Sequence, residues 1–421
     1  MEYNPLRALA TRSITKNMTK PAYISLADLR GFHRLASDAT IGLTDLVEAV
    51  HLTIVRTPGV LGESPTGRTG GITGLVYKSV LGVTRLVGAG VDVLLGALAP
   101  LIAQRTSSQE REALLAALNG VLGDYLVVSG NPLAITMHLR ASGASLTISK
   151  AALASALPNR KRKVLVLLHG LCMNHLQWTR DGHDHGAALA RDLGYAPVYL
   201  HYNSGKHIST NGREFADLME ILVGAWPHPM EQLTIIGHSM GGLVARSACH
   251  YATRAGHSWP KRLDHLVFLG TPHLGAPLAR AGTWADFLVG ISPYTAPFAR
   301  LGKVRSAGIK DLHHGNLRDE DWKAPAAASL RVARSALPLP HGVRCYAVAA
   351  SKQERPTASG TKARGDGLVP VHSALGLHRD SALNIALPAP HRWVGYGMGH
   401  LDLLSRGDVY AQLKGWLTAA Q

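Results

Sequence analysis

Between residues 163 and 351 the chain alternates short apolar runs with segments of helical periodicity. The runs are KVLVLLHG (163–170), APVYLHYN (196–203), LTIIGHS (233–239), HLVFLGTP (265–272) and VRCYAVAAS (343–351). Near-continuous apolar runs of this length are typical of strands inside a parallel sheet that helices cover on both faces. The pattern therefore predicts an α/β fold with a doubly wound, mostly parallel sheet.

The residues before this alternation follow a different period. Apolar residues recur at helical spacing through 25–55 and 72–100, and SSQEREALLAALNGVL (107–122) predicts a third helix. From about Leu126 the period changes, and AITMHLRASGASLTISK (134–150) alternates in two arms around Ser-Gly-Ala, as a β-hairpin does. We therefore expect an N-terminal helical region at 1–125, made of a helical hairpin and one helix, and an α/β domain at 126–421.

Composition and charge limit the classes of function. A hydrophobic content of 46% with 17% charged residues excludes wholesale disorder. The net charge of +16 suits anionic partners, but the longest basic run, RKRK (160–163), lacks interleaved aromatic residues, so we expect no nucleic-acid binding. The N-terminus has no apolar core of a signal peptide, and the three cysteines show no disulfide or metal-ligand spacing. A cytoplasmic protein is the expectation.

The sequence GHSMG (237–241) stands between a predicted strand and a predicted helix. It matches G-x-S-x-G, a tight strand-to-helix turn that lifts the serine hydroxyl clear of its neighbours. Gly237 and Gly241 are needed there because a Cβ at either position would meet the adjacent strand or helix. Ser239 is therefore the candidate nucleophile; a purely structural glycine turn is the alternative.

A serine nucleophile needs a histidine base that an acid orients. Asp366 lies in a glycine-flanked loop after the strand at 343–351, and His400 lies in a glycine-rich loop before the C-terminal helix. The order Ser239, Asp366, His400 is the one expected for a sheet of this kind. Asp402 is the alternative acid. The other histidines of this region, at positions 372, 378 and 391, lack the loop-then-helix setting.

Two backbone amides are expected to stabilise the oxyanion that forms during attack on an ester. One belongs to Met240, directly after the nucleophile, and the other to Leu171, in the loop after the first strand. Such a site needs no cofactor and no metal. The histidines of DGHDHG (181–186) and the pair His313–His314 are better explained by helix capping and exposure than by metal binding.

The motifs VLVLLHGLCMNHLQW, IIGHSMGG, LGTPHLGAP, GDGLVPVHSA and GMGHLDLL resemble the α/β-hydrolase superfamily. They are most similar to its bacterial lipase and esterase branch, related to GPI-inositol-deacylase-like and triacylglycerol-lipase-like proteins. The resemblance covers about residues 160–405. It implies the α/β-hydrolase fold and cofactor-free hydrolysis of carboxylic esters through an acyl-serine.

Several features bear on the substrate. The insertion at about 276–340 stands where such enzymes carry a lid, and it contains apolar residues able to line an acyl pocket (Trp284, Phe287, Leu288, Ile291, Tyr294 and Phe298). The low-charge stretch at 86–103 in the N-terminal helical region suggests a second hypothesis, peripheral association with a lipid surface; simple packing against the core is the alternative. The leading function is thus a serine esterase or lipase acting on a small-molecule or lipid ester. The alternatives are an acyltransferase with the same acyl-serine and a non-catalytic scaffold that binds a membrane or partner; the oligomeric state is left open.

Overall fold

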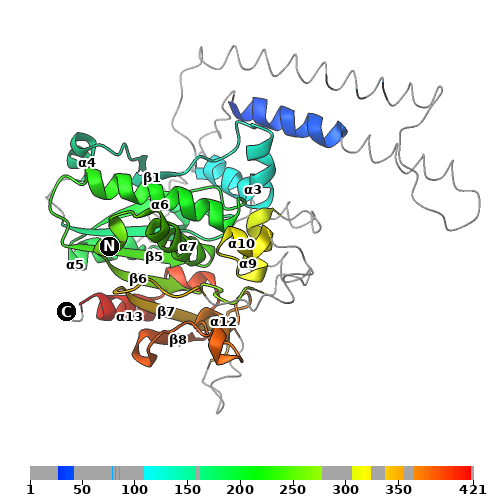
Figure 1. Ribbon diagram of the computed structural model, residues 1–421. Helices are drawn as coiled ribbons and strands as arrows, with labels where there is room; N and C mark the ends of the chain where they lie inside the picture. The colour runs from blue at the N-terminus through cyan, green and yellow to red at the C-terminus, as the bar shows by residue number, and fades with distance from the viewer. Residues whose placement is uncertain are drawn as a thin grey trace, which may run out of the picture.

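The computed structural model describes residues 27–41, 78, 81, 85, 109–157, 162–276, 306–323, 337–354 and 365–418. In this part of the chain the strands form one 8-stranded sheet of order β2-β1-β4-β3-β5-β6-β7-β8 (Figure 1). The strands from β4 to β8 are parallel, and β1 pairs antiparallel with both of its neighbours. The predicted doubly wound, mostly parallel sheet is confirmed.

The strands confirm the apolar runs and add one strand. They are β1 (His138–Ala141), β2 (Ala144–Ser145), β3 (Lys163–Leu168), β4 (Tyr195–His201), β5 (Gln232–His238), β6 (Leu263–Leu269), β7 (Arg344–Ser351) and β8 (Arg392–Tyr396). The predicted runs are β3 to β7, whose residues are almost all buried, as central strands of a covered sheet require. The predicted hairpin is β1–β2, turning through Ser142 and Gly143, both of positive φ.

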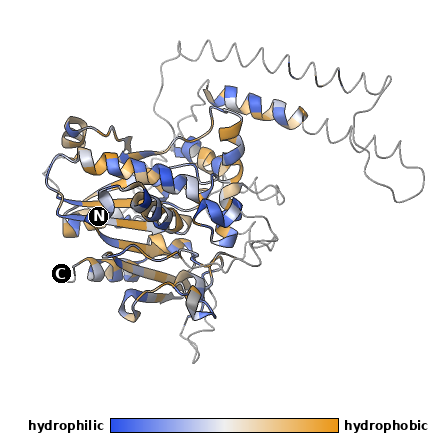
Figure 2. Ribbon diagram, in the orientation of Figure 1, coloured by the Kyte–Doolittle hydropathy of each residue, from blue (hydrophilic) through white to orange (hydrophobic). Residues whose placement is uncertain are grey.

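Helices cover the sheet on both faces. In chain order, the described α-helices from residue 109 onward are α3 (Gln109–Val128), α4 (Lys150–Ala156), α5 (His185–Leu193), α6 (Ile208–Ala225), α7 (Met240–Ala255), α9 (Ala307–His314), α10 (Asp319–Lys323), α12 (Val371–Ala374) and α13 (Gly407–Thr418). In the sheet, β4 lies on one side of β3, whereas β5 and then β6 lie on the other side. The connection from β3 to β4 therefore runs in one direction along the sheet, and the connections from β4 to β5 and from β5 to β6 run in the opposite direction. Right-handed crossovers therefore place α5 on the face opposite α6 and α7. Figure 2 shows the apolar colour concentrated in the sheet between these layers.

The reversal of direction at β3 and β5 positions the site. Ligands of doubly wound sheets bind at the carboxyl ends of strands where the strand order reverses. Here these ends are the loop after β3, which contains Leu171, and the turn after β5, which contains Ser239. The two segments that the sequence analysis assigns to the site therefore leave adjacent strands at the same edge of the sheet.

The N-terminal part contributes two described helices. Residues 27–41 are helical, and Asp28 forms an ion pair with Arg111 of α3 at 2.5 Å. Helix α3 extends to Val128, so the boundary placed after residue 125 falls within a helix. This helix also lies directly on the α/β domain: a Cβ on Gly120 would lie 2.2 Å from Cys172 Sγ, and one on Gly123 would lie 1.9 Å from Asn203 Oδ1. The third predicted helix is thus packed against the loops that follow β3 and β4.

The other N-terminal predictions and most of the insertion lie outside the described residues. The low-charge stretch at 86–103 and the apolar residues of the insertion from Trp284 to Phe298 are among them. The helices in the described part of the insertion are α9 and α10. No helix in the described ranges combines the length and apolarity needed to cross a membrane.

Candidate active site

Ser239 occupies a strained turn between β5 and α7. Its backbone has φ 53° and ψ −121°, in a region that residues with a Cβ rarely adopt. The flanking glycines permit the turn: a Cβ on Gly241 would lie 2.3 Å from the Leu168 carbonyl oxygen, and one on Gly237 would lie 2.5 Å from Gly242 Cα. The steric reason given for both glycines from sequence is therefore confirmed. The turn has the geometry of a nucleophile elbow.

Asp366 and His400 are brought together although 34 positions separate them. The Nδ1 atom of His400 lies 2.7 Å from Asp366 Oδ2, and both side chains are buried. The other carboxylate oxygen accepts hydrogen bonds from the amides of Leu368 at 2.9 Å and Val369 at 2.8 Å. These bonds fix the carboxylate, which in turn fixes the orientation of the imidazole ring.

The alternative acid is engaged elsewhere. Asp402 Oδ2 accepts a hydrogen bond from the Gly399 amide at 2.7 Å, which shapes the loop around His400 instead of orienting its ring. The Nε2 atom of His400 is buried and has no hydrogen-bond partner among the described residues. With Nδ1 directed to the carboxylate, Nε2 is the nitrogen available to accept a proton.

Gly270 connects the histidine with the serine turn. The Ser239 amide donates to the Leu269 carbonyl at 2.8 Å, and the next residue, Gly270, has φ 58°. A Cβ on Gly270 would lie 3.0 Å from His400 Cε1, so the imidazole ring lies directly against the end of β6. The strand that neighbours the serine turn is therefore also the surface on which the histidine rests.

The loop after β3 lies beside Ser239. A Cβ on Gly170 would lie 3.2 Å from Ser239 Cβ, so the glycine allows this close approach. Within the described part of the chain, the backbone amides of Leu171 and Met240 have no hydrogen-bond acceptor. Both amides that the sequence analysis assigned to the oxyanion are thus unoccupied donors on segments adjoining the serine.

Contacts that the sequence did not reveal hold this loop. Cys172 has φ 58°, and its amide donates to Ser204 Oγ at 3.0 Å. Tyr202 donates its hydroxyl proton to the His169 carbonyl at 2.8 Å. His238, next to the serine, places its Nε2 3.3 Å from the His400 carbonyl oxygen. His238 has a sequence signal, since it lies inside the G-x-S-x-G motif, whereas Tyr202 and Ser204 come from the loop after β4 and have none.

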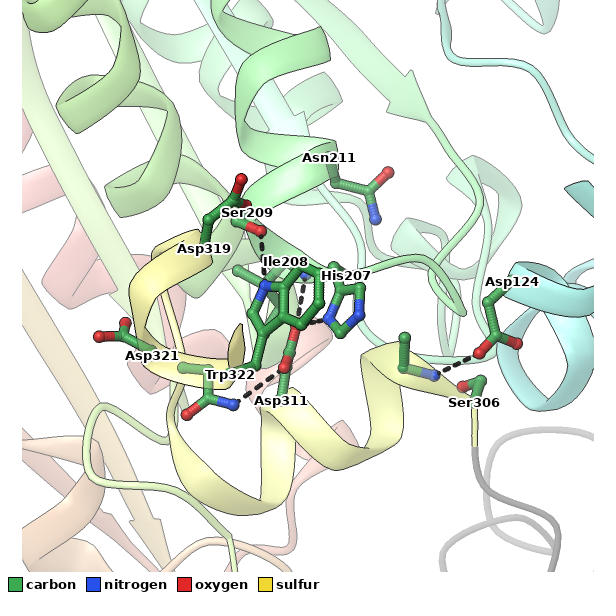
Figure 3. Close-up of polar contacts among 12 residues, drawn as sticks. Asp124, His207, Ile208, Ser209, Asn211, Ser306, Asp311, Asp319, Asp321 and Trp322 are labelled. Carbon is green, nitrogen blue, oxygen red and sulfur yellow. Dashed lines mark hydrogen bonds and ion pairs between the residues drawn. The ribbon is translucent and has the colours of Figure 1, made fainter. Parts of the chain in front are cut away.

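The described part of the insertion is anchored through a buried carboxylate. Asp311 of α9 accepts hydrogen bonds from the Ile208 amide at 2.9 Å and from Asn316 at 2.9 Å, and it lies 2.9 Å from His207 Nδ1 (Figure 3). The His207 ring stacks on Trp322 of α10 with a centroid separation of 3.6 Å. Helix α6 has no side-chain cap of its own. Asp311 supplies that cap from 103 positions away.

We expect Asp311→Ala to lower the free energy of unfolding by about 2–4 kcal/mol, because it leaves buried donors on Ile208 and Asn316 without an acceptor. Urea unfolding followed by circular dichroism measures the loss. Asp319→Ala is the matched control, since Asp319 lies on α10 in partly exposed ion pairs with Arg213 and Lys323 and should cost at most about 1 kcal/mol. Equal losses for the two variants would contradict the anchoring role of Asp311.

Three buried histidines lie beside the loop after β3. The ring centroid of His201 is 6.3 Å from that of His169 and 5.7 Å from that of His175. Burial lowers the pKa of His169 to about 4 and that of His175 to about 3, and it lowers the pKa of His201 well below 6.5. In the folded protein these rings are therefore neutral at physiological pH.

These pKa shifts predict that stability falls in mild acid. An unfolded histidine binds a proton near pH 6.5, whereas His169 resists protonation until about pH 4. The unfolded state therefore gains protons first, so the free energy of unfolding is constant above about pH 6.5 and decreases as pH falls toward 4. At about 1.4 kcal/mol per pKa unit, His169 alone accounts for roughly 3 kcal/mol.

Urea unfolding at pH 7.5, 6 and 5 measures this dependence. His175→Phe is the informative variant, because it keeps a ring at a site where neither imidazole nitrogen has a partner among the described residues. We expect it to reduce the loss between pH 6.5 and 5. A free energy of unfolding that is constant from pH 7.5 to 5 would contradict the assignment of neutral buried rings.

Comparisons with known proteins agree with the fold. Residues 161–338 match the family model described as the PGAP1-like alpha/beta domain. The match covers less than half of the chain, and together with the sheet order it agrees with the α/β-hydrolase fold that the motifs predict. No curated protein matches the chain.

Solved structures of low identity are also similar to it. The mature lipase BlEst2 of Bacillus licheniformis is 18% identical, with a TM-score of 0.39 over 62% of this chain and 93% of that one. The esterase Pf2001 of Pyrococcus furiosus is 13% identical, with a TM-score of 0.37 over 61% and 80%. Phospholipase PlaB of Legionella pneumophila, in complex with thio-NAD, is 14% identical, with a TM-score of 0.33 over 50% and 44%.

Proposed function

We propose that this chain is a serine esterase or lipase that hydrolyses carboxylic esters. The observation that carries the proposal is the Asp366–His400 pair, whose free Nε2 lies in a ring packed against the strand end next to Ser239. A serine in a strained turn, a base held by a buried carboxylate and two unoccupied amides are the groups that acyl transfer requires.

The proposed reaction has two halves. Ser239 Oγ attacks the ester carbonyl carbon while His400 Nε2 takes the hydroxyl proton, and the resulting imidazolium is stabilised by Asp366. The amides of Leu171 and Met240 donate to the oxyanion. As the carbon–oxygen bond breaks, the imidazolium returns the proton to the leaving alcohol. Water then attacks the acyl-serine by the same route, releasing the carboxylic acid and restoring the serine.

A series of p-nitrophenyl esters of increasing acyl length tests the reaction. We expect saturable release of p-nitrophenol that requires Ser239, with the dependence on chain length reporting the size of the acyl pocket. An optimum at long acyl chains favours a lipase, and one at short chains an esterase. Absence of hydrolysis across the whole series by folded protein would contradict the proposal.

A further inference from the structure

A cavity of about 140 Å³ is lined by residues of α7 and of the insertion, among them Arg246 and Asn316. Its polar lining includes Arg246, His273, Asn316, Arg318 and Asp321. Among the described residues, neither Ser239, Asp366 nor His400 lines it. At roughly 30 Å³ for each water, the cavity has room for a few waters or one tetrahedral oxyanion. It is therefore a separate feature from the candidate active site.

Arg246 is a buried cation without a carboxylate partner. Arg246 is only 3% exposed, and within the described ranges no ion pair joins its guanidinium to a carboxylate. Nη1 lies 3.2 Å from His273 Nδ1, Nη2 donates to the Leu337 carbonyl, and Nε has no partner among the described residues. Burial lowers the pKa of Arg246 to about 10, so the group is still charged at neutral pH. Buried charges are normally paired.

His273 provides a second donor that lacks an acceptor. Its Nδ1 accepts from Arg246, which assigns the ring proton to Nε2. Nε2 is buried and has no partner in the part of the chain that the structure describes. Burial, with the nearby Arg246 charge, lowers the pKa of His273 well below 6.5, so the ring is neutral. The Arg246–His273 pair thus carries one positive charge and two buried donors, Arg246 Nε and His273 Nε2, that have no acceptor among the described residues.

The acidic residue of the lining does not neutralise this pair. Asp321 accepts hydrogen bonds from the Leu317 and Arg318 amides, each at 2.8 Å, and from the Arg318 guanidinium at 2.9 Å. Its hydrogen-bonded cation is therefore Arg318 of its own turn, although the Asp321 charge also acts on Arg246 and partly offsets the lowering of its pKa by burial. The remaining charge of the cavity is the Arg246 guanidinium, which attracts an anion rather than a cation.

We propose that this cavity binds a phosphate group, held by the Arg246 guanidinium and the Nε2 proton of His273. A phosphate presents acceptor oxygens in several directions, which matches donors that approach from α7 and from the turn after β6. The phosphate belongs either to a free ion or to a lipid head group. Because the cavity is separate from Ser239, the proposal holds whether or not the chain hydrolyses esters.

Thermal unfolding of the full chain in inorganic phosphate tests the site, with chloride and acetate at the same ionic strength as controls. At about ten times Kd we expect phosphate to raise the melting temperature by roughly 2–4 °C, because a ligand that binds only the folded state stabilises it. Flotation with phosphatidylcholine vesicles, with and without phosphatidic acid, tests the lipid source. A shift of equal size in acetate would overturn the assignment of phosphate.

Arg246→Met removes the charge with a side chain of similar length and is expected to fold, since an unpaired buried charge is replaced by an apolar group. Arg254→Met removes the same charge from an exposed position of the same helix. His273→Phe keeps the ring without the Nε2 proton, and it provides the test if Arg246→Met does not fold. We expect His273→Phe to weaken phosphate binding by at least about tenfold.

Thermal unfolding in inorganic phosphate and flotation with vesicles distinguish the two sources of the phosphate. A phosphate-dependent shift that Arg246→Met abolishes and Arg254→Met keeps supports the site with a free ion. Binding only to vesicles with phosphatidic acid, with the same dependence on the variants, supports it with a lipid head group. If phosphate has no effect in either experiment, or an equal effect on Arg246→Met and Arg254→Met, the cavity holds water only and the proposal is overturned.

Discussion

Ser239→Ala is expected to lower kcat for ester hydrolysis on the order of 10⁴- to 10⁶-fold while leaving the protein folded. The variant removes a single oxygen from a side chain that is already 4% exposed and forms no hydrogen bond through its hydroxyl within the described residues. The Asp366–His400 pair is left in place, but His400 has no nucleophile to activate. Steady-state kinetics with p-nitrophenyl esters, together with a melting curve, measure both parts of the expectation.

Ser145→Ala is the matched control for this variant. Ser145 is exposed on β2, at the far edge of the sheet from the serine turn, so the same atom is removed where no chemistry is expected. Its kinetics should equal those of the wild type. Residual activity of Ser239→Ala equal to that of Ser145→Ala would remove Ser239 as the nucleophile.

Gly241→Ala is expected to destabilise the fold by at least about 3 kcal/mol and to abolish activity. The added Cβ would lie 2.3 Å from the Leu168 carbonyl oxygen and 2.7 Å from that of His169. Both are backbone atoms of β3 and its following loop, so no flexible side chain can move aside. Relief of the clash must separate α7 from the strand and displace the loop that bears Leu171. Urea unfolding measures the loss.

Gly415→Ala makes the same chemical change where space is free. Gly415 lies in α13, and a Cβ there would meet no atom within 4 Å. Alanine is favoured over glycine in helices, so this variant should gain up to about 1 kcal/mol and keep full activity. If Gly241→Ala is as stable as the wild type, the close contact between α7 and β3 is not what the turn requires.

The sheet was largely predictable because its signals are local. Each of the runs that form β3 to β7 is a buried apolar stretch. The five residues of the Gly-His-Ser-Met-Gly turn are enough to predict the close approach of a helix to a strand, because both flanking glycines are needed for it. Strand β8 was missed because Arg392–Tyr396 lies at the sheet edge and is mostly half-buried, so it lacks a continuous apolar run. Strands at an edge leave a weaker pattern than those in the centre.

Contacts between distant residues were not predictable. Nothing near Ile208 indicates that α6 is capped by Asp311, and nothing near Arg246 indicates a partner in His273. The helical spacing of α3 predicted a helix, but not its contact with Cys172 in the loop after β3. Such contacts arise from tertiary packing, and the local pattern of a single sequence carries no information about them.

Covalent labelling with a fluorophosphonate, which phosphonylates activated serines, tests whether Ser239 is the nucleophile. The full chain is incubated with the reagent, digested and analysed by mass spectrometry. We expect one adduct, located on Ser239, with loss of ester hydrolysis in proportion to labelling and no adduct in Ser239→Ala. An adduct on a different residue that accompanies the loss of activity, or unlabelled Ser239 in a protein that hydrolyses esters, would contradict it.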